Sequence, residues 1–204
     1  MLIERPPLLL QWMTPSLLWR VNTTEKEVYL TFDDGPVPEV TPWVLNTLDR
    51  YNIKATFFCV GENVEKYPEL FSLVREKGHA LGNHTYNHLK LYKTEQEAYC
   101  RNIRKASLRN DSRLFRPPHG QINRSMIQWL HVRKYKVVMW DVLPADYNKE
   151  RTGEQCFETV KRKTRPGSII VFHDSVKAQK NLMEALPLSI EYLLNQGWKF
   201  KTLT

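Results

Sequence analysis

The sequence predicts a single-domain parallel α/β barrel with seven strands, and three observations support this fold class. A chain of 204 residues has the length of one ordinary domain. Short apolar β-like segments alternate along it with segments of helical periodicity, which is typical of βαβ units. Polar clusters directly follow five of the apolar segments, and catalytic groups of parallel barrels gather at the carboxyl ends of strands. Seven strands predict a distorted or incompletely closed barrel.

The strands are predicted from alternating or continuous apolar residues. In the first strand, Val28, Leu30 and Phe32 share one face. The sixth strand is fully apolar, as expected for a strand buried on both faces. The predicted strands are 28–33, 55–60, 79–83, 114–116, 136–142, 168–172 and 198–203.

Helices are predicted between these strands from their start and stop signals. Thr41 before Pro42 is interpreted as a helix cap, and 94–97 as a capping box. Gly78 is expected to end the helix that Pro68 begins. The remaining predicted helices follow Asn123 as cap, begin at Thr152, and span 181–195.

The first 25 residues are expected to pack as an arm against the barrel of residues 26–204. Their apolar residues are interrupted by Pro6, Pro7 and Pro15, and they lack the basic start and small-residue cleavage site of a signal peptide. The apolar stretch is also shorter than the roughly 20 residues of a spanning helix. A cytoplasmic location is the default expectation, with weak contact to a membrane surface as the alternative.

Charge and cysteine content narrow the class of protein. The net charge of +8 favours anionic partners, but Lys and Arg are spread over the chain, so no nucleic-acid binding is expected. The three cysteines have no CxxC spacing and predict buried thiols. The sequence leaves the oligomeric state open.

A metal site is predicted from two of the polar clusters. His84 and His88 are four residues apart, so one helical turn would place both imidazoles on one face. Such a pair alone is also compatible with two surface histidines. Asp33 and Asp34 end the first strand, and adjacent carboxylates repel unless a cation compensates them. One carboxylate with two histidines is the ligand set of a catalytic metal ion with open coordination positions.

The other three clusters supply an arginine, a carboxylate and an imidazole. Arg116 precedes a rigid Pro-rich segment that can hold its guanidinium against a carboxylate. Asp146 and His173 each end an apolar strand, and a carboxylate beside an imidazole favours the protonated form. Taken alone, Arg116 is also compatible with an exposed arginine before a loop, Asp146 with a turn residue and His173 with a capped strand end. Five clusters at five strand ends nevertheless indicate one site.

These clusters resemble the five ordered motifs of the polysaccharide deacetylases, the NodB-homology or carbohydrate esterase family 4 domain. The matching segments are Thr31-Phe32-Asp33-Asp34-Gly35, His84-Thr85-x-x-His88, Arg116-Pro117-Pro118-x-Gly120, Asp146 with a following aromatic residue, and Val171-x-His173-Asp174. The resemblance covers 26–204 and implies a distorted seven-stranded β/α barrel. It also implies metal-dependent removal of N-acetyl groups from amino sugars in glycans.

The resemblance implies a role for each matching residue. Asp34, His84 and His88 would be the metal ligands, and Asp33 the base that takes a proton from the attacking water. His173 would protonate the leaving amine. Arg116 would orient Asp33, and Asp146 would pair with His173. The backbone N–H after Pro118, at His119, would stabilise the oxyanion.

Four departures from the family pattern affect substrate contacts more than chemistry. His119, beside Gly120, replaces the usual Tyr, and Tyr147 replaces the usual Trp. Val171 replaces the usual Leu of the acetyl pocket, and the additional Asp often found before Asp146 is absent. Specificity is therefore expected to differ more than activity.

The favoured function is a carbohydrate N-deacetylase acting on N-acetylhexosamine units, with zinc as the expected metal and cobalt or nickel as substitutes. The alternatives are a non-catalytic glycan-binding relative and a hydrolase of O-acetyl esters or another amide. The sequence does not identify the glycan.

Overall fold

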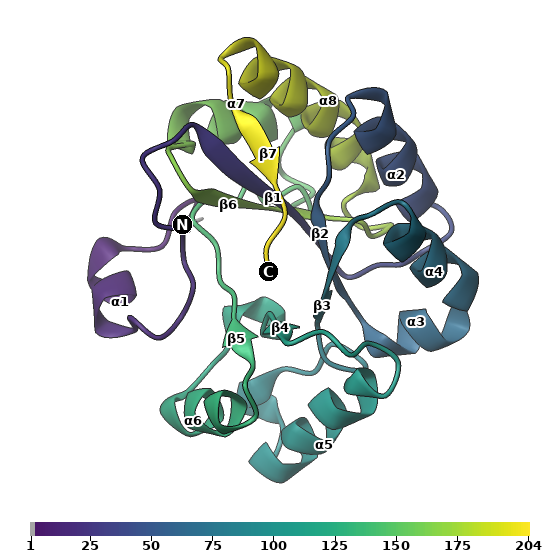
Figure 1. Cartoon of the computed structure of the whole chain (residues 1–204), viewed down its shortest axis with the longest axis vertical. Helices are drawn as coiled ribbons and strands as arrows, with labels where there is room; N and C mark the ends of the chain where they lie inside the picture. Colours follow the sequence, from purple (N-terminus) through teal and green to yellow (C-terminus); the bar gives the residue numbers. More distant parts are fainter. Residues whose placement is uncertain (1–2) are drawn as a thin grey trace.

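In the computed structural model, which describes residues 3–204, strands and helices alternate as predicted, and a parallel sheet curls inside a ring of helices (Figure 1). The strands are β1 (Glu27–Asp33), β2 (Thr56–Cys59), β3 (Ala80–Asn83), β4 (Leu114–Phe115), β5 (Lys136–Val137), β6 (Ser168–His173) and β7 (Lys199–Lys201). The helices are α1 (Leu8–Met13), α2 (Thr41–Arg50), α3 (Gly61–Lys66), α4 (Pro68–Glu76), α5 (Gln96–Ser107), α6 (Arg124–Val132), α7 (Gly153–Lys163) and α8 (Gln179–Asn195), with 3-10 turns at Leu91–Lys93 and Pro118–Gly120.

All neighbouring strands pair in parallel, so their carboxyl ends lie at the same end of the sheet. The order is β5-β4-β3-β2-β1-β6, and β7 pairs with the first half of β1. Asp33 at the end of β1 is the register partner of His173 at the end of β6. Asn83 at the end of β3 pairs with Phe115 at the end of β4. Residues that directly follow these strands therefore lie close together.

The N-terminal segment occupies the gap between β5 and β6. The Leu18 N–H donates to the Val137 carbonyl at 2.9 Å, and Met139 N–H donates to the Leu18 carbonyl at 2.8 Å. Arg20 forms an antiparallel bridge with Ser168 at the start of β6. Backbone hydrogen bonds from this segment thus cover strand edges that the seven-stranded sheet leaves open.

Two charged residues fix the beginning of this segment. Glu4 accepts hydrogen bonds from Arg151 and Thr159 at 3.2 and 2.8 Å. Arg5 donates to the buried carboxylate of Asp141 at 3.3 Å. By contrast, α1 has no buried residue. No helix in the described part of the chain is both long and apolar enough to span a membrane.

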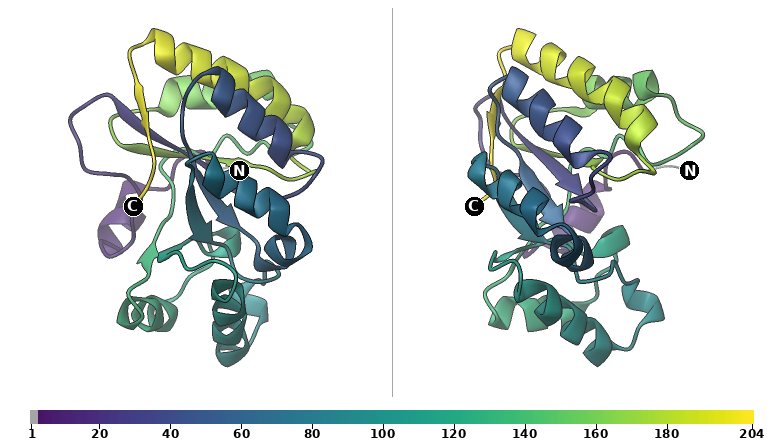
Figure 2. Two further views of the ribbon diagram at one scale, coloured as in Figure 1. Left: turned by 45° about the vertical axis from the view of Figure 1, so that its right-hand side comes forward. Right: turned by 90° about the vertical axis from the view of Figure 1, so that its right-hand side faces the viewer.

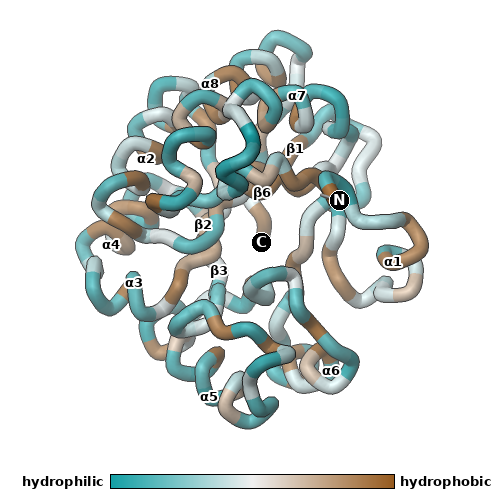
Figure 3. Tube along the Cα trace, turned by 180° about the vertical axis from the view of Figure 1, so that it is seen from behind, coloured by the Kyte–Doolittle hydropathy of each residue, from teal (hydrophilic) through white to brown (hydrophobic). Residues whose placement is uncertain are grey.

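The core lies on both sides of the sheet. Phe32 on β1 stacks against Phe57 on β2, with ring centroids 5.0 Å apart, and against Phe172 on β6 at 6.4 Å. The hydropathy trace shows apolar strands inside and hydrophilic stretches along the outer helices (Figure 3). Two further views show α2 and α8 side by side over one end of the sheet (Figure 2).

Several predicted boundaries were wrong for identifiable reasons. The fifth strand is two residues long, because the chain beyond it pairs with Leu18 and then, at Val142, with β6. Thr41 lies inside α2 and its hydroxyl donates to Asp174, so it caps no helix. Thr94 likewise bonds the Lys90 carbonyl instead of forming a capping box.

Other boundaries agree with the sequence signals. Asn123 accepts the Met126 N–H as the cap of α6, and Thr152 forms a capping box with Gln155 at the start of α7. The short helix α3 was not predicted. Its six residues carry too little apolar periodicity to indicate a helix.

Candidate active site

Asp34, His84 and His88 converge beyond the ends of β1 and β3. Their potential ligand atoms all lie within 4.8 Å of one another. Asp34 Oδ1 is 3.3 Å from His88 Nε2 and 3.8 Å from His84 Nε2. The three side chains therefore surround a space of the size that one ion needs.

The two histidines meet through a turn, so the predicted helical turn between them was wrong. Thr85 and His88 both have left-handed backbone conformations, with φ of 63° and 56°. The Thr85 N–H donates to Asn83 Oδ1 at 2.8 Å, and the Thr85 carbonyl accepts the Gly61 N–H at 2.9 Å. These bonds hold the chain in a conformation that helical periodicity does not describe.

The donor set fits a divalent metal ion. Asp34 Oδ1 is buried and has no hydrogen-bond partner in the described structure. His84 Nδ1 lies 2.8 Å from the Arg116 carbonyl, which only accepts, so Nδ1 carries the proton and Nε2 keeps its lone pair. Burial lowers the pKa of His84 to about 4, so the imidazole is neutral, as a metal ligand must be.

Asp34 is ionised despite its burial. Burial raises the pKa of its carboxyl group, but opposing effects, the largest of them from the protonated His173, outweigh burial and lower the pKa. An anionic oxygen beside two imidazoles is a ligand set that suits zinc and other first-row divalent ions.

Arg116 holds Asp33 beside these ligands. Its Nη1 donates to Asp33 Oδ1 at 2.7 Å and to Thr31 Oγ1 at 2.8 Å, while Nη2 donates to the Met139 carbonyl at 3.0 Å. The guanidinium is fully buried and lies 4.1 Å from the centre of the Phe58 ring. Asp33 Oδ2 is 4.0 Å from His84 Nε2, so it faces the three potential ligands.

His173 and Asp146 form the second half of the site. His173 Nδ1 lies 2.8 Å from Asp146 Oδ1, and the His173 backbone N–H donates to Asp146 Oδ2, also at 2.8 Å. Burial lowers the pKa of His173, but Asp146 and then Asp34 and Asp33 raise it to about 9. The imidazole is therefore protonated at neutral pH.

The segment after Arg116 carries a strained turn. His119 has φ of 58° and Gly120 has φ of 65°. A Cβ at Gly120 would lie 2.5 Å from the Trp140 ring, so only glycine fits there. The exposed His119 ring lies 4.5 Å from the His88 ring, next to the potential metal ligands.

A small apolar wall lies beside His173. Val171 packs with Leu143 and Ala145 in one buried cluster, and Trp140 and Tyr147 lie against it. The Tyr147 ring meets the His173 ring edge-on at 4.8 Å. Val171 and Tyr147 were expected at the site from the sequence, whereas Trp140 and Ala145 were not, because nothing in their local pattern indicates this contact.

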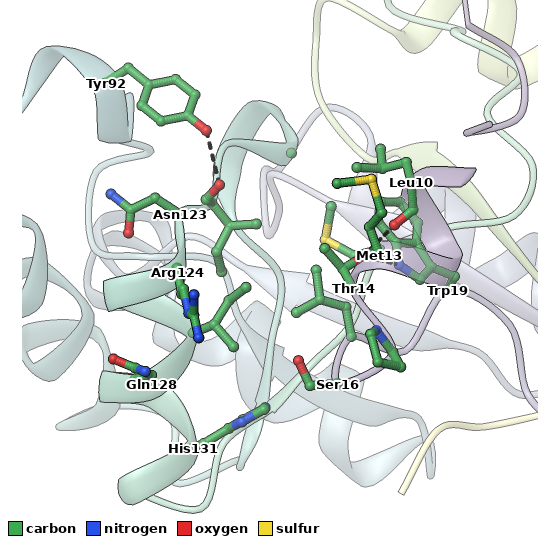
Figure 4. Close-up of a pocket in the computed structure, with 16 residues that line it drawn as sticks. Leu10, Met13, Thr14, Ser16, Trp19, Tyr92, Asn123, Arg124, Gln128 and His131 are labelled. Carbon is green, nitrogen blue, oxygen red and sulfur yellow. Dashed lines mark hydrogen bonds between the residues drawn. The ribbon is translucent and has the colours of Figure 1, made fainter. Parts of the chain in front are cut away.

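A separate groove of about 800 Å³ runs between the N-terminal segment and α6. Figure 4 shows Leu10, Met13 and Trp19 on one side of it and Arg124 and His131 on the other. None of the potential metal ligands lines this groove, so it is distinct from the cluster that they form.

Comparison with known proteins identifies the family. A family model described as polysaccharide deacetylase matches residues 20–138, more than half of the chain. The chain belongs to the polysaccharide deacetylase family. This assignment confirms the resemblance inferred from the motifs, and the parallel barrel is the predicted fold class.

Similar proteins are named as carbohydrate N-deacetylases. A peptidoglycan-N-acetylglucosamine deacetylase of Bacillus cereus is 35% identical over 87% of this chain and 66% of its own length. A chitooligosaccharide deacetylase of Azorhizobium caulinodans is 33% identical over 76% of this chain and 77% of its own. Thus the chain spans about two thirds of the first relative and three quarters of the second.

A solved structure extends the similarity to nearly the whole chain. A peptidoglycan N-acetylglucosamine deacetylase in complex with 4-naphthalen-1-yl-N-oxidanyl-benzamide superimposes with a TM-score of 0.90 and 32% identity. The alignment covers 97% of this chain and 95% of that one.

Proposed function

We propose that this member of the polysaccharide deacetylase family is a metal-dependent hydrolase that removes N-acetyl groups from N-acetylhexosamine units of a glycan. One observation carries the proposal: an unpartnered Asp34 oxygen lies between two imidazoles, and the neighbouring Asp33 is held by a buried arginine. This combination supplies a place for an ion and a separate base. The names of the relatives support N-acetylated glycans as the substrate class.

Asp34, His84 and His88 would hold the ion. The chemistry that a divalent ion supplies at such a site is Lewis acidity, which polarises a carbonyl group and makes water more acidic. Zinc is the proposed ion, with cobalt or nickel as substitutes, because carboxylate and imidazole ligands suit all three.

Asp33 is proposed to act as the general base. One of its oxygens accepts a hydrogen bond from Arg116, which orients the carboxylate. The other oxygen faces the ligand cluster, where it takes a proton from the water that attacks the acetamide carbon. The new C–O bond then forms without a covalent bond to the protein.

His173 is proposed to act as the general acid. Asp146 binds its Nδ1 and keeps the ring protonated, which leaves the Nε2 proton for the departing nitrogen. Breaking the C–N bond after this transfer releases acetate and a free amine. The two proton-transfer roles belong to separate pairs, Arg116–Asp33 and Asp146–His173, whose environments differ as two-role catalysis requires.

The remaining contacts are proposed to orient the acetamide group. The His119 backbone N–H would donate to the developing oxyanion, as donors in oxyanion holes do. The apolar wall formed by Val171, Ala145 and their neighbours would accept the acetyl methyl group. Pro118 and Gly120 fix the turn that presents this N–H.

Acetate release tests the proposal against its alternatives. The panel is chitooligosaccharides, peptidoglycan fragments and O-acetylated xylan, each with metal-free protein and with protein reloaded with zinc, cobalt or nickel. We expect metal-dependent release from the N-acetylated substrates. Release from xylan alone would favour an O-acetyl esterase, and glycan binding without release would favour the non-catalytic alternative.

A further inference from the structure

Asp174 follows the general acid in the sequence, yet its side chain points toward the metal-ligand turn. Its Oδ1 accepts the Gly35 N–H at 3.0 Å, and its Oδ2 accepts the Thr41 hydroxyl at 2.7 Å. The Asp174 backbone N–H donates to the Asp33 carbonyl at 3.1 Å. Through these three hydrogen bonds one buried residue joins the end of β6 to the end of β1, the turn after it and the start of α2.

We propose that Asp174 is a positioning residue that, together with Thr41, fixes the Asp33–Asp34–Gly35 turn in its metal-binding conformation. The inference rests on the proposed metal site at Asp34, His84 and His88. It concerns neither a ligand atom nor a proton-transfer group.

The peptide between Asp34 and Gly35 is held from both of its edges. The Asp34 carbonyl accepts a hydrogen bond from Asn63 Nδ2 at 2.8 Å, and the Gly35 N–H on the other edge donates to Asp174. Fixing this peptide plane fixes the direction in which the Asp34 side chain leaves the backbone. The Asp34 carboxylate can then face His84 and His88.

Asp34 needs such support because its backbone is strained. Its φ of 86° lies in the left-handed region, which a residue with a side chain adopts only when its surroundings impose it. A Cβ at Gly35 would lie 1.9 Å from Asp174 Oδ2, so the close contact with Asp174 requires glycine. The turn and the carboxylate are therefore fitted to each other.

Thr41 extends the support to the rest of the loop. Besides donating to Asp174, its Oγ1 accepts the Val37 N–H at 2.8 Å. The Asp174 side chain is almost completely buried, and burial raises the pKa of its carboxyl group to about 8 despite hydrogen bonds from Thr41 and Gly35. Burying a carboxyl group lowers the stability of the fold. A buried carboxyl group at this position is therefore consistent with a positioning role at the turn.

The test is the affinity of substrate-free protein for zinc, measured by competition with a fluorescent chelator. Asp174→Ala should weaken zinc binding by about 10–100-fold, the usual cost of losing a group that orients a metal ligand. Thr41→Val, which keeps the shape but removes the hydroxyl, should weaken it in the same direction by a smaller factor. Thr41→Ser should restore the wild-type affinity.

Asp141→Asn is the matched control, because Asp141 is a fully buried carboxylate bound to Arg165 and Ser168 away from the ligand cluster. It should lower the melting temperature without changing zinc affinity. Zinc affinity within twofold of wild type in both Asp174→Ala and Thr41→Val, or an equal loss in Asp141→Asn, would overturn the inference. If Asp174→Ala does not fold, the difference in zinc affinity between Thr41→Val and Thr41→Ser tests the inference.

The assay separates this inference from the proposed function. It uses no substrate, so a protein that binds zinc through this turn but releases no acetate would contradict only the proposed function. A wild-type protein that binds no zinc would overturn both.

Discussion

Asp146 binds both the side chain and the backbone of His173. Its two carboxylate oxygens accept the Nδ1–H and the main-chain N–H of that residue, each at 2.8 Å. Asn181 in turn donates to the Asp146 carbonyl at 2.9 Å. The imidazole is therefore fixed in orientation as well as in charge.

The first prediction concerns pH. Burial lowers the pKa of His173, but Asp146, Asp34 and Asp33 raise it from 6.5 to about 9. A general acid must be protonated to act. The value of kcat should therefore stay constant at pH values below this pKa and fall as the pH rises through about 9. A cation beside Asp34 offsets part of the rise, so the limb of the metal-loaded enzyme should lie at or below that pH.

Asp146→Asn should move this alkaline limb to lower pH, because it removes the largest contribution that raises the pKa. The measurement is a pH–rate profile of deacetylation for wild type and variant at saturating metal. An unchanged limb would show that Asp146 does not tune His173.

The second prediction distinguishes amide from ester substrates. An amine leaves poorly unless it is protonated, while an alcohol leaves more readily. His173→Ala should therefore harm hydrolysis of an N-acetylated oligosaccharide more than hydrolysis of an activated acetyl ester, by about 10²-fold or more. Comparing kcat/KM on both substrates checks this, and equal losses would mean that His173 is not the proton donor.

The third prediction separates the two adjacent carboxylates. Asp33→Asn keeps the three ligand atoms in place, so metal content should stay near normal while kcat falls by about 10²–10⁴-fold. Asp34→Ala removes a ligand and should lower metal affinity itself. Metal content after dialysis and the rate of acetate release are measured on the same samples. Together the two measurements distinguish the role of Asp33 from that of Asp34. Equal metal loss in both variants with an active Asp33→Asn would require the two roles to be exchanged.

The sequence predicted the parallel barrel because alternating strands and helices are a local pattern. It also predicted that Asp33, Arg116 and His173 come together, since Asp33 and His173 end neighbouring strands and Arg116 directly follows another strand of the same parallel sheet. The route of the chain between His84 and His88 was not predictable in the same way. A threonine at φ of 63° is stabilised by its contacts with Asn83 and Gly61, which no local pattern displays.

Two further predictions were wrong for the same reason, namely contacts between distant parts of the chain. Thr41 has the sequence context of a helix cap, but its hydroxyl donates a hydrogen bond to the buried Asp174, 133 residues away. The fifth strand was predicted too long because the segment after Val137 is apolar. In the structure that segment pairs with Leu18 of the N-terminal arm, a partner that periodicity alone does not reveal.

The last prediction concerns the stability that this arm provides. Trp19 is 7% exposed, lies edge-on to Trp140 at 6.4 Å and donates its indole N–H to Thr14 at 3.0 Å. Trp19→Ala should lower the free energy of unfolding by about 3–5 kcal/mol, because it removes a large buried side chain and leaves a cavity beside β5.

Trp12, in the same arm, is the matched control. Its side chain is 78% exposed on α1, so Trp12→Ala should change the free energy of unfolding by no more than about 0.5 kcal/mol. Urea denaturation of both variants, followed by circular dichroism, measures the difference. If the two substitutions had equal effects, the arm would not be packed against the barrel in solution, and the strand edges that Leu18 and Arg20 cover would be open to solvent.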